Sequence, residues 1–121
     1  MDIQSHRDLI VWQRSMQLVR QVYELTRRFP REELYGLTSQ LRRATVSIPA
    51  NISEGHGRGT RRDYAHFVTM AMGSACEVET LLETSVIVGI VSYDEIRICA
   101  GLLDETGRML RVLRRRLLSR E

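Results

Sequence analysis

The chain has 121 residues, 43% of them apolar, and a formal net charge of +3. This length suits a single domain that buries a core without a disulfide or structural metal. The sequence holds no run of about 18 apolar residues and no basic start followed by an apolar stretch. We therefore expect no membrane span, no signal peptide, a cytoplasmic location and no cofactor. Cys76 and Cys99 match no zinc spacing and are expected to be free thiols in the core.

All 18 basic residues are arginines, and they are unevenly distributed. Residues 1–62 carry a net charge of +5, residues 63–107 carry −7, and residues 108–121 carry +5. We favour genome composition as the explanation for the missing lysines, because high GC content favours arginine codons, with phosphate or carboxylate binding by arginine as the alternative. The uneven distribution instead indicates an anionic partner or head-to-tail packing between copies.

The first predicted helix covers residues 8–29, because apolar residues recur there at spacings of three and four. Pro30 is expected to stop it, since proline lacks an N–H and clashes with the preceding turn. The stripe expected to face the core consists of Leu9, Trp12, Met16, Val19 and Tyr23. A second apolar set lies beside it and consists of Val11, Leu18, Val22 and Leu25. A polar stripe lies on the opposite face and consists of Arg7, Arg14, Gln21 and Arg28.

The second predicted helix covers residues 32–57 and has a core stripe of Leu34, Leu37, Leu41, Thr45, Ile48 and Ile52. Pro49 is expected to kink this helix rather than end it, because the apolar period continues to Ile52. The glycine-rich segment 55–59 follows no strand, so we interpret it as a turn rather than a phosphate-binding loop.

A polar strip runs beside this core stripe. It is expected to be a hydrogen-bond network that fixes helix packing, and a subunit contact or a ligand groove is the alternative. Glu54 and Arg58 form an i,i+4 pair in the favourable order. The strip consists of Gln40, Ser47, Asn51, Glu54 and Arg58, with Arg43 grouped among them.

The third predicted helix, 61–89, opens with a capping pair, Thr60 and Asp63. Its small residues 73–75 are expected to allow close helix approach. Its inward face consists of Tyr64, Phe67, Val68, Ala71, Ala75, Val78, Leu82 and Val86.

The fourth predicted helix, 93–119, opens with a capping box of Ser92 and Glu95. It carries two apolar seams, one of Ile96, Cys99, Leu103, Leu110, Leu113 and Leu117, the other of Ile98, Leu102, Met109 and Val112. Four helices with short connections predict an all-α fold, an antiparallel up-and-down four-helix bundle in one domain, 1–121. The surplus apolar seams indicate a subunit interface and hence a homo-oligomer.

An arginine stripe follows one face of the 93–119 helix. Phosphate contacts from arginine supply the sequence-independent part of nucleic-acid affinity, so we expect a nucleic-acid-binding surface, with a solvated face as the alternative. The stripe consists of Arg97, Arg108, Arg111 and Arg115, interrupted by Asp104 and flanked by Arg114, Arg116 and Arg120. The three histidines are scattered and imply neither a catalytic dyad nor a metal set.

Several segments together resemble a known family. They are 8–12, Phe29-Pro30, 33–44, 47–55, and Gly73-Ser74 with Glu77. They are similar to the bacterial four-helix-bundle family first noticed as proteins encoded in intervening sequences of 23S rRNA genes. The resemblance implies a ring-like homopentamer. It also implies a distant relation to the accessory variability determinant of diversity-generating retroelements, a basic pentameric bundle that binds nucleic acid and a reverse transcriptase. It brings no catalytic residues, so the signature residues from Gln40 to Gly55 are interpreted as structural or interface residues first.

The sequence thus predicts a non-enzymatic homo-oligomer, most simply a pentamer, that binds RNA or DNA through arginine-rich surfaces. One alternative is a protein-interaction scaffold, or a reverse-transcriptase accessory, without nucleic-acid affinity of its own. The least favoured alternative is an enzyme that uses the polar strip.

Overall fold

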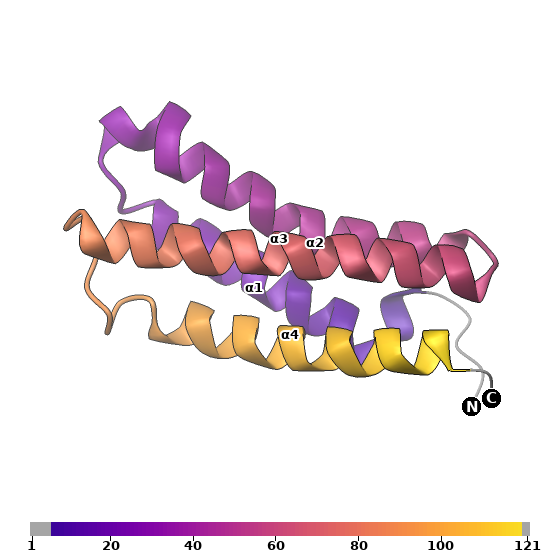
Figure 1. Cartoon of the computed structure of the whole chain (residues 1–121). Coiled ribbons are helices and arrows are strands. Elements are labelled where there is room, and N and C mark those ends of the chain that lie inside the picture. Colours follow the sequence, from indigo (N-terminus) through magenta and orange to yellow (C-terminus); the bar gives the residue numbers. More distant parts are fainter. Residues whose placement is uncertain (1–5, 120–121) are drawn as a thin grey trace.

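The computed structural model describes residues 6–119 and contains four long helices. They are α1 (Ile10–Thr26), α2 (Ser39–Gly57), α3 (Arg61–Ile87) and α4 (Arg97–Leu118), with short turns η1 (His6–Asp8), η2 (Arg31–Glu33) and η3 (Leu34–Thr38). Each helix returns along the previous one, α1 and α3 each packing against both α2 and α4 (Figure 1). The predicted all-α chain with four helices is confirmed, and the described residues contain no strand.

The face of α1 that meets the core is the one beside the predicted stripe, not the predicted stripe itself. Leu18 and Val22 are fully buried, whereas Met16 and Tyr23 are 40% and 37% exposed. Both stripes have helical spacing, so periodicity alone could not show which of them faces the core. The set that looked surplus forms the core, and the stripe assigned to the core lies partly on the surface.

Two hydroxyl residues complete the buried face of α1, which explains why it looked less apolar in the sequence. Ser15 and Thr26 are buried, and their hydroxyls donate to the carbonyls of Trp12 and Val22 on the same helix, at 2.8 Å in both cases. A buried hydroxyl with a hydrogen-bond partner carries little of the usual desolvation cost.

The chain between α1 and α2 departs from the predicted helix bounds. α1 ends at Thr26, four residues before Pro30, and α2 begins at Ser39, seven residues later than predicted. Helical geometry is broken at Gly36, where φ and ψ are both −114°. Leu34, predicted in the core, is 45% exposed as a result.

α2 continues through Pro49 rather than ending there, as predicted, and the predicted kink stays a prediction. Thr45, Ile48 and Ile52 on either side of the proline are fully buried. Their packing in the core holds the helix together across the backbone hydrogen bond that proline cannot donate.

Both predicted capping arrangements form, but only the one at Thr60 caps the start of a long helix. Thr60 accepts a hydrogen bond from the Asp63 N–H at 3.1 Å. Ser92 and Glu95 each accept from the other's backbone N–H, at 3.2 and 3.0 Å. This box closes a turn ahead of α4 rather than its first turn, so α4 begins at Arg97, four residues later than predicted.

Gly55 allows α2 to lie close to α3. A Cβ placed there would lie 2.8 Å from Phe67 Cβ and 3.2 Å from the carbonyl oxygen of Tyr64. Gly73, which the sequence suggested for this role, is exposed, and a Cβ at its position would meet nothing within 4 Å. The close approach therefore depends on a glycine near the end of α2, not on the small-residue patch of α3.

These two glycines provide a matched test of the fold. We expect Gly55→Ala to lower the free energy of unfolding by about 1–3 kcal/mol, because backbone and a Cβ must shift to admit the methyl group. Gly73→Ala in the same chain should raise it by roughly 0.5–1 kcal/mol, because alanine is the better helix former where space is open. Urea unfolding followed by circular dichroism measures both, and equal effects of the two changes would contradict the packing described.

Candidate nucleic-acid interface

One end of the bundle gathers arginines from three helices. The end of α2, the start of α3 and the end of α4 meet there, at the yellow end of α4 in Figure 1. The Arg61 side chain donates hydrogen bonds to the main-chain carbonyls of Arg116 and Leu117, which ties α3 to the last turn of α4. We name this region the basic end, formed by Arg58, Arg61, Arg62, Arg108, Arg111, Arg114, Arg115 and Arg116.

The predicted arginine stripe of α4 does not act as one surface. Arg97 lies 18 residues before Arg115, about 27 Å along the helix at 1.5 Å per residue, and therefore at the opposite end of the bundle. It is also paired with Asp94 at 3.6 Å. Arg108 pairs with Asp104 at 3.1 Å. The stripe is thus divided, and only its C-terminal part joins the basic end.

Most of the remaining arginines at the basic end are unpaired. Within residues 6–119, no carboxylate lies within ion-pair distance of Arg62, Arg111, Arg114, Arg115 or Arg116. Arg58 pairs with Glu54 at 3.1 Å and lies over the Phe67 ring at 4.8 Å. Arg120, which the sequence placed beside the stripe, lies outside the described residues.

Aromatic rings also gather at this end but pack against one another. The rings of His6 and Trp12 are 5.1 Å apart, those of His6 and His56 are 6.5 Å apart, and those of His56 and Tyr64 are 5.8 Å apart, all edge to face. The Tyr64 hydroxyl is buried, and burial raises its pKa. Rings engaged edge to face with each other are not arranged as a stacking platform for bases.

The polar stripe predicted for the first helix contributes ion pairs within the bundle instead. Arg14 pairs with Glu105 of α4 at 3.0 Å, and Arg28 pairs with Glu95 at 3.3 Å. The stripe was visible in the sequence but its partners were not, because ion pairs between helices depend on which neighbour each face meets.

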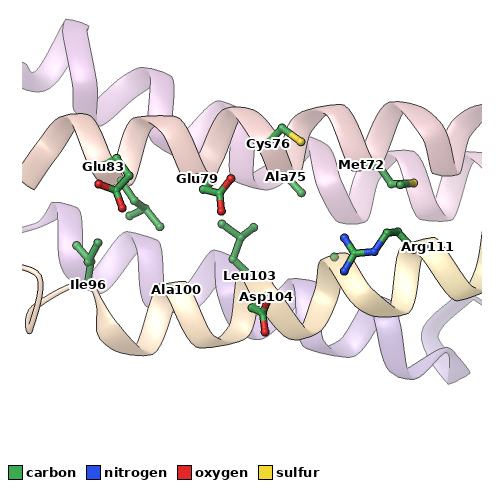
Figure 2. A pocket seen from close by; sticks show the side chains of 12 residues that line it. Met72, Ala75, Cys76, Glu79, Glu83, Ile96, Ala100, Leu103, Asp104 and Arg111 are labelled. Atoms are coloured by element: carbon green, nitrogen blue, oxygen red, sulfur yellow. The ribbon is translucent and has the colours of Figure 1, made fainter.

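A groove of about 210 Å³ lies between α3 and α4, and its only sign in the sequence was the acidic segment 63–107. Glu79 and Glu83 extend from α3 toward α4, and the Arg111 guanidinium lies at the other end of the groove (Figure 2). The Tyr93 hydroxyl donates to Glu83 at 3.0 Å, and this hydrogen bond raises the pKa of Tyr93. The floor is apolar, formed mainly by Met72, Ala75, Leu82, Ile96 and Leu103.

The predicted polar strip of α2 includes a contact between helices. Ser47 Oγ lies 2.7 Å from the Ala44 carbonyl oxygen and 2.5 Å from Ser74 Oγ on α3. A hydroxyl has one proton, so Ser47 donates to Ala44 and accepts from Ser74. The Asn51 side chain donates to the Ser47 carbonyl at 2.8 Å. This half of the strip is part of the α2–α3 packing.

The other members of the strip face outward. Gln40, Arg43, Glu54 and Arg58 are exposed. Arg43 borders a shallow hollow of α1 and α2 that also includes Tyr23, Val46 and Ser47. Nearby, Arg42 lies over the Tyr23 ring at 4.4 Å and donates to Thr26 Oγ1 at 2.8 Å, which joins α2 to α1. No group of three metal-ligating side chains occurs in residues 6–119.

The architecture and its basic end define a small helical-bundle protein with a strongly polarised surface. The chain belongs to the family of 23S rRNA-intervening sequence proteins, whose model matches residues 7–112. The resemblance found in the sequence is confirmed at the level of the family, and the relation to the retroelement protein stays a prediction. No helix within residues 6–119 has the length and apolarity that crossing a membrane requires.

The fold is shared with a solved structure. That structure is a protein with unknown function from the S23 ribosomal protein family of Bacteroides thetaiotaomicron VPI-5482. The TM-score is 0.74 at 20% identity, over 84% of this chain and 94% of that chain. At this identity the likeness shows the fold alone. No curated protein matches the chain.

The Ser47–Ser74 hydrogen bond can be tested with a double-mutant cycle. We expect Ser47→Ala and Ser74→Ala each to lower the free energy of unfolding by about 0.5–1.5 kcal/mol, and the double variant to cost less than the sum. Ser53 is the control, because its hydroxyl bonds only the Ala50 carbonyl on the same helix. Strict additivity for Ser47 and Ser74 in urea unfolding would show that the two hydroxyls are not coupled.

Proposed function

We propose that the protein is a non-enzymatic homo-oligomer that binds RNA or DNA through its basic end. The observation that carries this proposal is the group of five arginines there, Arg62, Arg111, Arg114, Arg115 and Arg116, without an ion pair in residues 6–119. Like charges held close together repel one another, and a polyanion removes that cost on binding. Guanidinium groups also match phosphate oxygens with two parallel hydrogen bonds.

The α1–α2 side supports the oligomeric part of the proposal. Tyr23 and Val46 share a shallow hollow and are 37% and 41% exposed, and Met16 lies two turns before Tyr23 on α1. Exposed apolar side chains rimmed by polar ones are typical of protein interfaces. The family resemblance supplies the number five. In a ring with parallel bundle axes the five basic ends lie on one side, so weak single contacts add through avidity.

The scaffold alternative has one observation in its favour. The α3–α4 groove is acidic, and an acidic groove suits a basic protein segment rather than a nucleic acid. In that case the protein acts as an adaptor, for example as a reverse-transcriptase accessory, and the arginines contact protein. The enzyme alternative has less support, because the polar strip holds no nucleophile paired with a base.

A pair of charge-neutralising variants tests the nucleic-acid proposal. We expect Arg111→Gln with Arg115→Gln to weaken binding to generic RNA or DNA. It should also flatten the log–log salt dependence, by about 0.7–0.9 for each phosphate contact removed. Fluorescence anisotropy titrations between low and high salt measure both quantities.

The control removes the same charge elsewhere. Arg20 and Arg31 are exposed and lie away from the basic end, so Arg20→Gln with Arg31→Gln should change the slope little. Equal slopes for the two double variants would exclude the basic end as the binding surface. Wild-type protein that fails to bind even at low salt would favour the scaffold alternative.

The oligomer is tested by one surface substitution. Five copies of 14.0 kDa have a mass of about 70 kDa. We expect light scattering to give this mass for wild type and a smaller one for Val46→Glu, because the carboxylate would be buried in the apolar contact. Val88→Glu is the control, since Val88 is 59% exposed at the far end of α3. A monomeric wild type at micromolar concentration would contradict the proposal.

A further inference from the structure

The surface formed by α3 and α4 is divided along its length into an acidic and a basic half. Glu79 and Glu83 line the groove at one end, and Arg111 lies at the other end (Figure 2). Arg115 follows Arg111 by about one turn of α4, and Arg62 lies in the first turn of α3. Arg97 is the cation of the acidic half, and Asp94 neutralises it at 3.6 Å.

The two helices are in a known register, so these charges can be placed along one axis. The Tyr93–Glu83 hydrogen bond fixes the register at the acidic end, and the hydrogen bonds from Arg61 to the last turn of α4 fix it at the basic end. Midway between Glu83 and Arg62 lies Met72, which lines the groove. The acids and the unpaired arginines are therefore spaced almost evenly on either side of Met72.

We infer that two copies of this chain pair antiparallel through the α3–α4 face, about a two-fold axis near Met72. That rotation places Glu79 and Glu83 of each copy opposite the arginine region of the partner copy, where Arg62, Arg111 and Arg115 lie. A two-fold contact is self-complementary, so every carboxylate–guanidinium pairing occurs twice. Bidentate carboxylate–guanidinium pairs are among the stronger charge-assisted hydrogen bonds.

The shape of this face suits a close helical neighbour. Ala100 and Gly107 line the groove, and both present little side chain to a neighbouring helix. Small residues on an exposed face let a second backbone approach. The apolar floor between the charged halves gives the pairing a desolvated centre, in which ion pairs are screened less than at an open surface.

This pairing is argued from other observations than the proposed nucleic-acid binding, and the two contacts compete because both use Arg111 and Arg115. It leaves the α1–α2 hollow uncovered. Variants of Glu79 and Glu83 separate the two proposals, because these carboxylates are needed for the pairing and take no part in phosphate binding.

Cys76 provides a native probe for the pairing. It is exposed and lines the groove four residues from Met72, so the two thiols of a pair are separated by about eight residues, roughly 12 Å along the helix direction. Cys99 does not interfere, because it is buried and its burial raises the pKa of the thiol to about 11, which keeps it protonated and unreactive near neutral pH.

The experiment treats the full chain with a flexible bismaleimide of that reach at low and at high salt. We expect a covalent dimer on a denaturing gel at low salt, and its loss in 1 M salt (~3 Å Debye length) and in Cys76→Ser. Glu79→Gln with Glu83→Gln should also lose most of the product, while it binds nucleic acid at least as well as wild type. The glutamine introduced by Glu83→Gln can still accept the Tyr93 hydrogen bond, so the fold is kept, which thermal unfolding verifies.

The matched control is Glu32→Gln with Glu77→Gln. It removes the same charge from exposed positions that do not line the groove, and should leave the cross-link yield at the wild-type level. No cross-link in wild type at low salt, or an equal yield in the two double variants, would overturn the inference. Neither result tests the proposed function. The salt dependence of nucleic-acid binding by the arginine variants tests it separately.

Discussion

The close packing of α2 against α3 is the contact on which the rest of this bundle depends. Gly55 leaves room for Phe67 and for the backbone at Tyr64, and the Ser47–Ser74 hydrogen bond holds the two helices farther along. Only residues 58–60 separate α2 from α3. A short link between tightly packed helices leaves little freedom in how the chain turns, so this contact also fixes where α3 begins.

The position of that turn decides the electrostatic character of the molecule. Arg61 leaves the turn toward α4 and caps its last carbonyls, which carry partial negative charge at a helix C-terminus. The antiparallel order then brings the C-terminal arginines beside those of the α2–α3 turn, although the two groups are far apart in sequence. Glu79 and Glu83 of α3 lie on the other half of the same face. The end of the N-terminal basic segment and the C-terminal basic segment thereby meet at the basic end, while Arg28 of the N-terminal segment pairs with Glu95 at the other end.

Much of the fold follows from the sequence, because helical periodicity and caps are local. The Thr60 cap, the Ser92–Glu95 box and the passage of α2 through Pro49 all depend on residues within one or two turns. The buried face of α1 was missed because two stripes had equal periodicity. Ser15, whose hydroxyl bonds its own helix, made the true core face look polar.

The candidate site was harder to predict from the sequence, because its residues come from neighbouring helices. Arg97 and Arg115 share a helical face, yet a face about 27 Å long crosses from one electrostatic environment to another. Arg61 and Arg62 were missing from the predicted site, although the predicted antiparallel order already placed the start of the third helix beside the end of the fourth. The groove between α3 and α4 had no local signal, because its depth depends on small residues of both helices, such as Ala75 and Ala100.

If both proposals hold, the two uses of Arg111 and Arg115 are linked. An antiparallel pair covers these guanidinium groups with carboxylates, so a nucleic acid reaches them only after the pair opens. Coupling between two binding events is reciprocal, so pairing weakens nucleic-acid binding by the same factor by which bound nucleic acid weakens pairing. Salt acts on both contacts in the same direction and cannot separate them. Removing the charges of Glu79 and Glu83 weakens the pairing and strengthens nucleic-acid binding, because Arg111 and Arg115 are then free to contact phosphates. Pairing increases with protein concentration and covers the arginines. The apparent affinity for a polyanion therefore depends on the concentration of the protein as well as on the protein's charge.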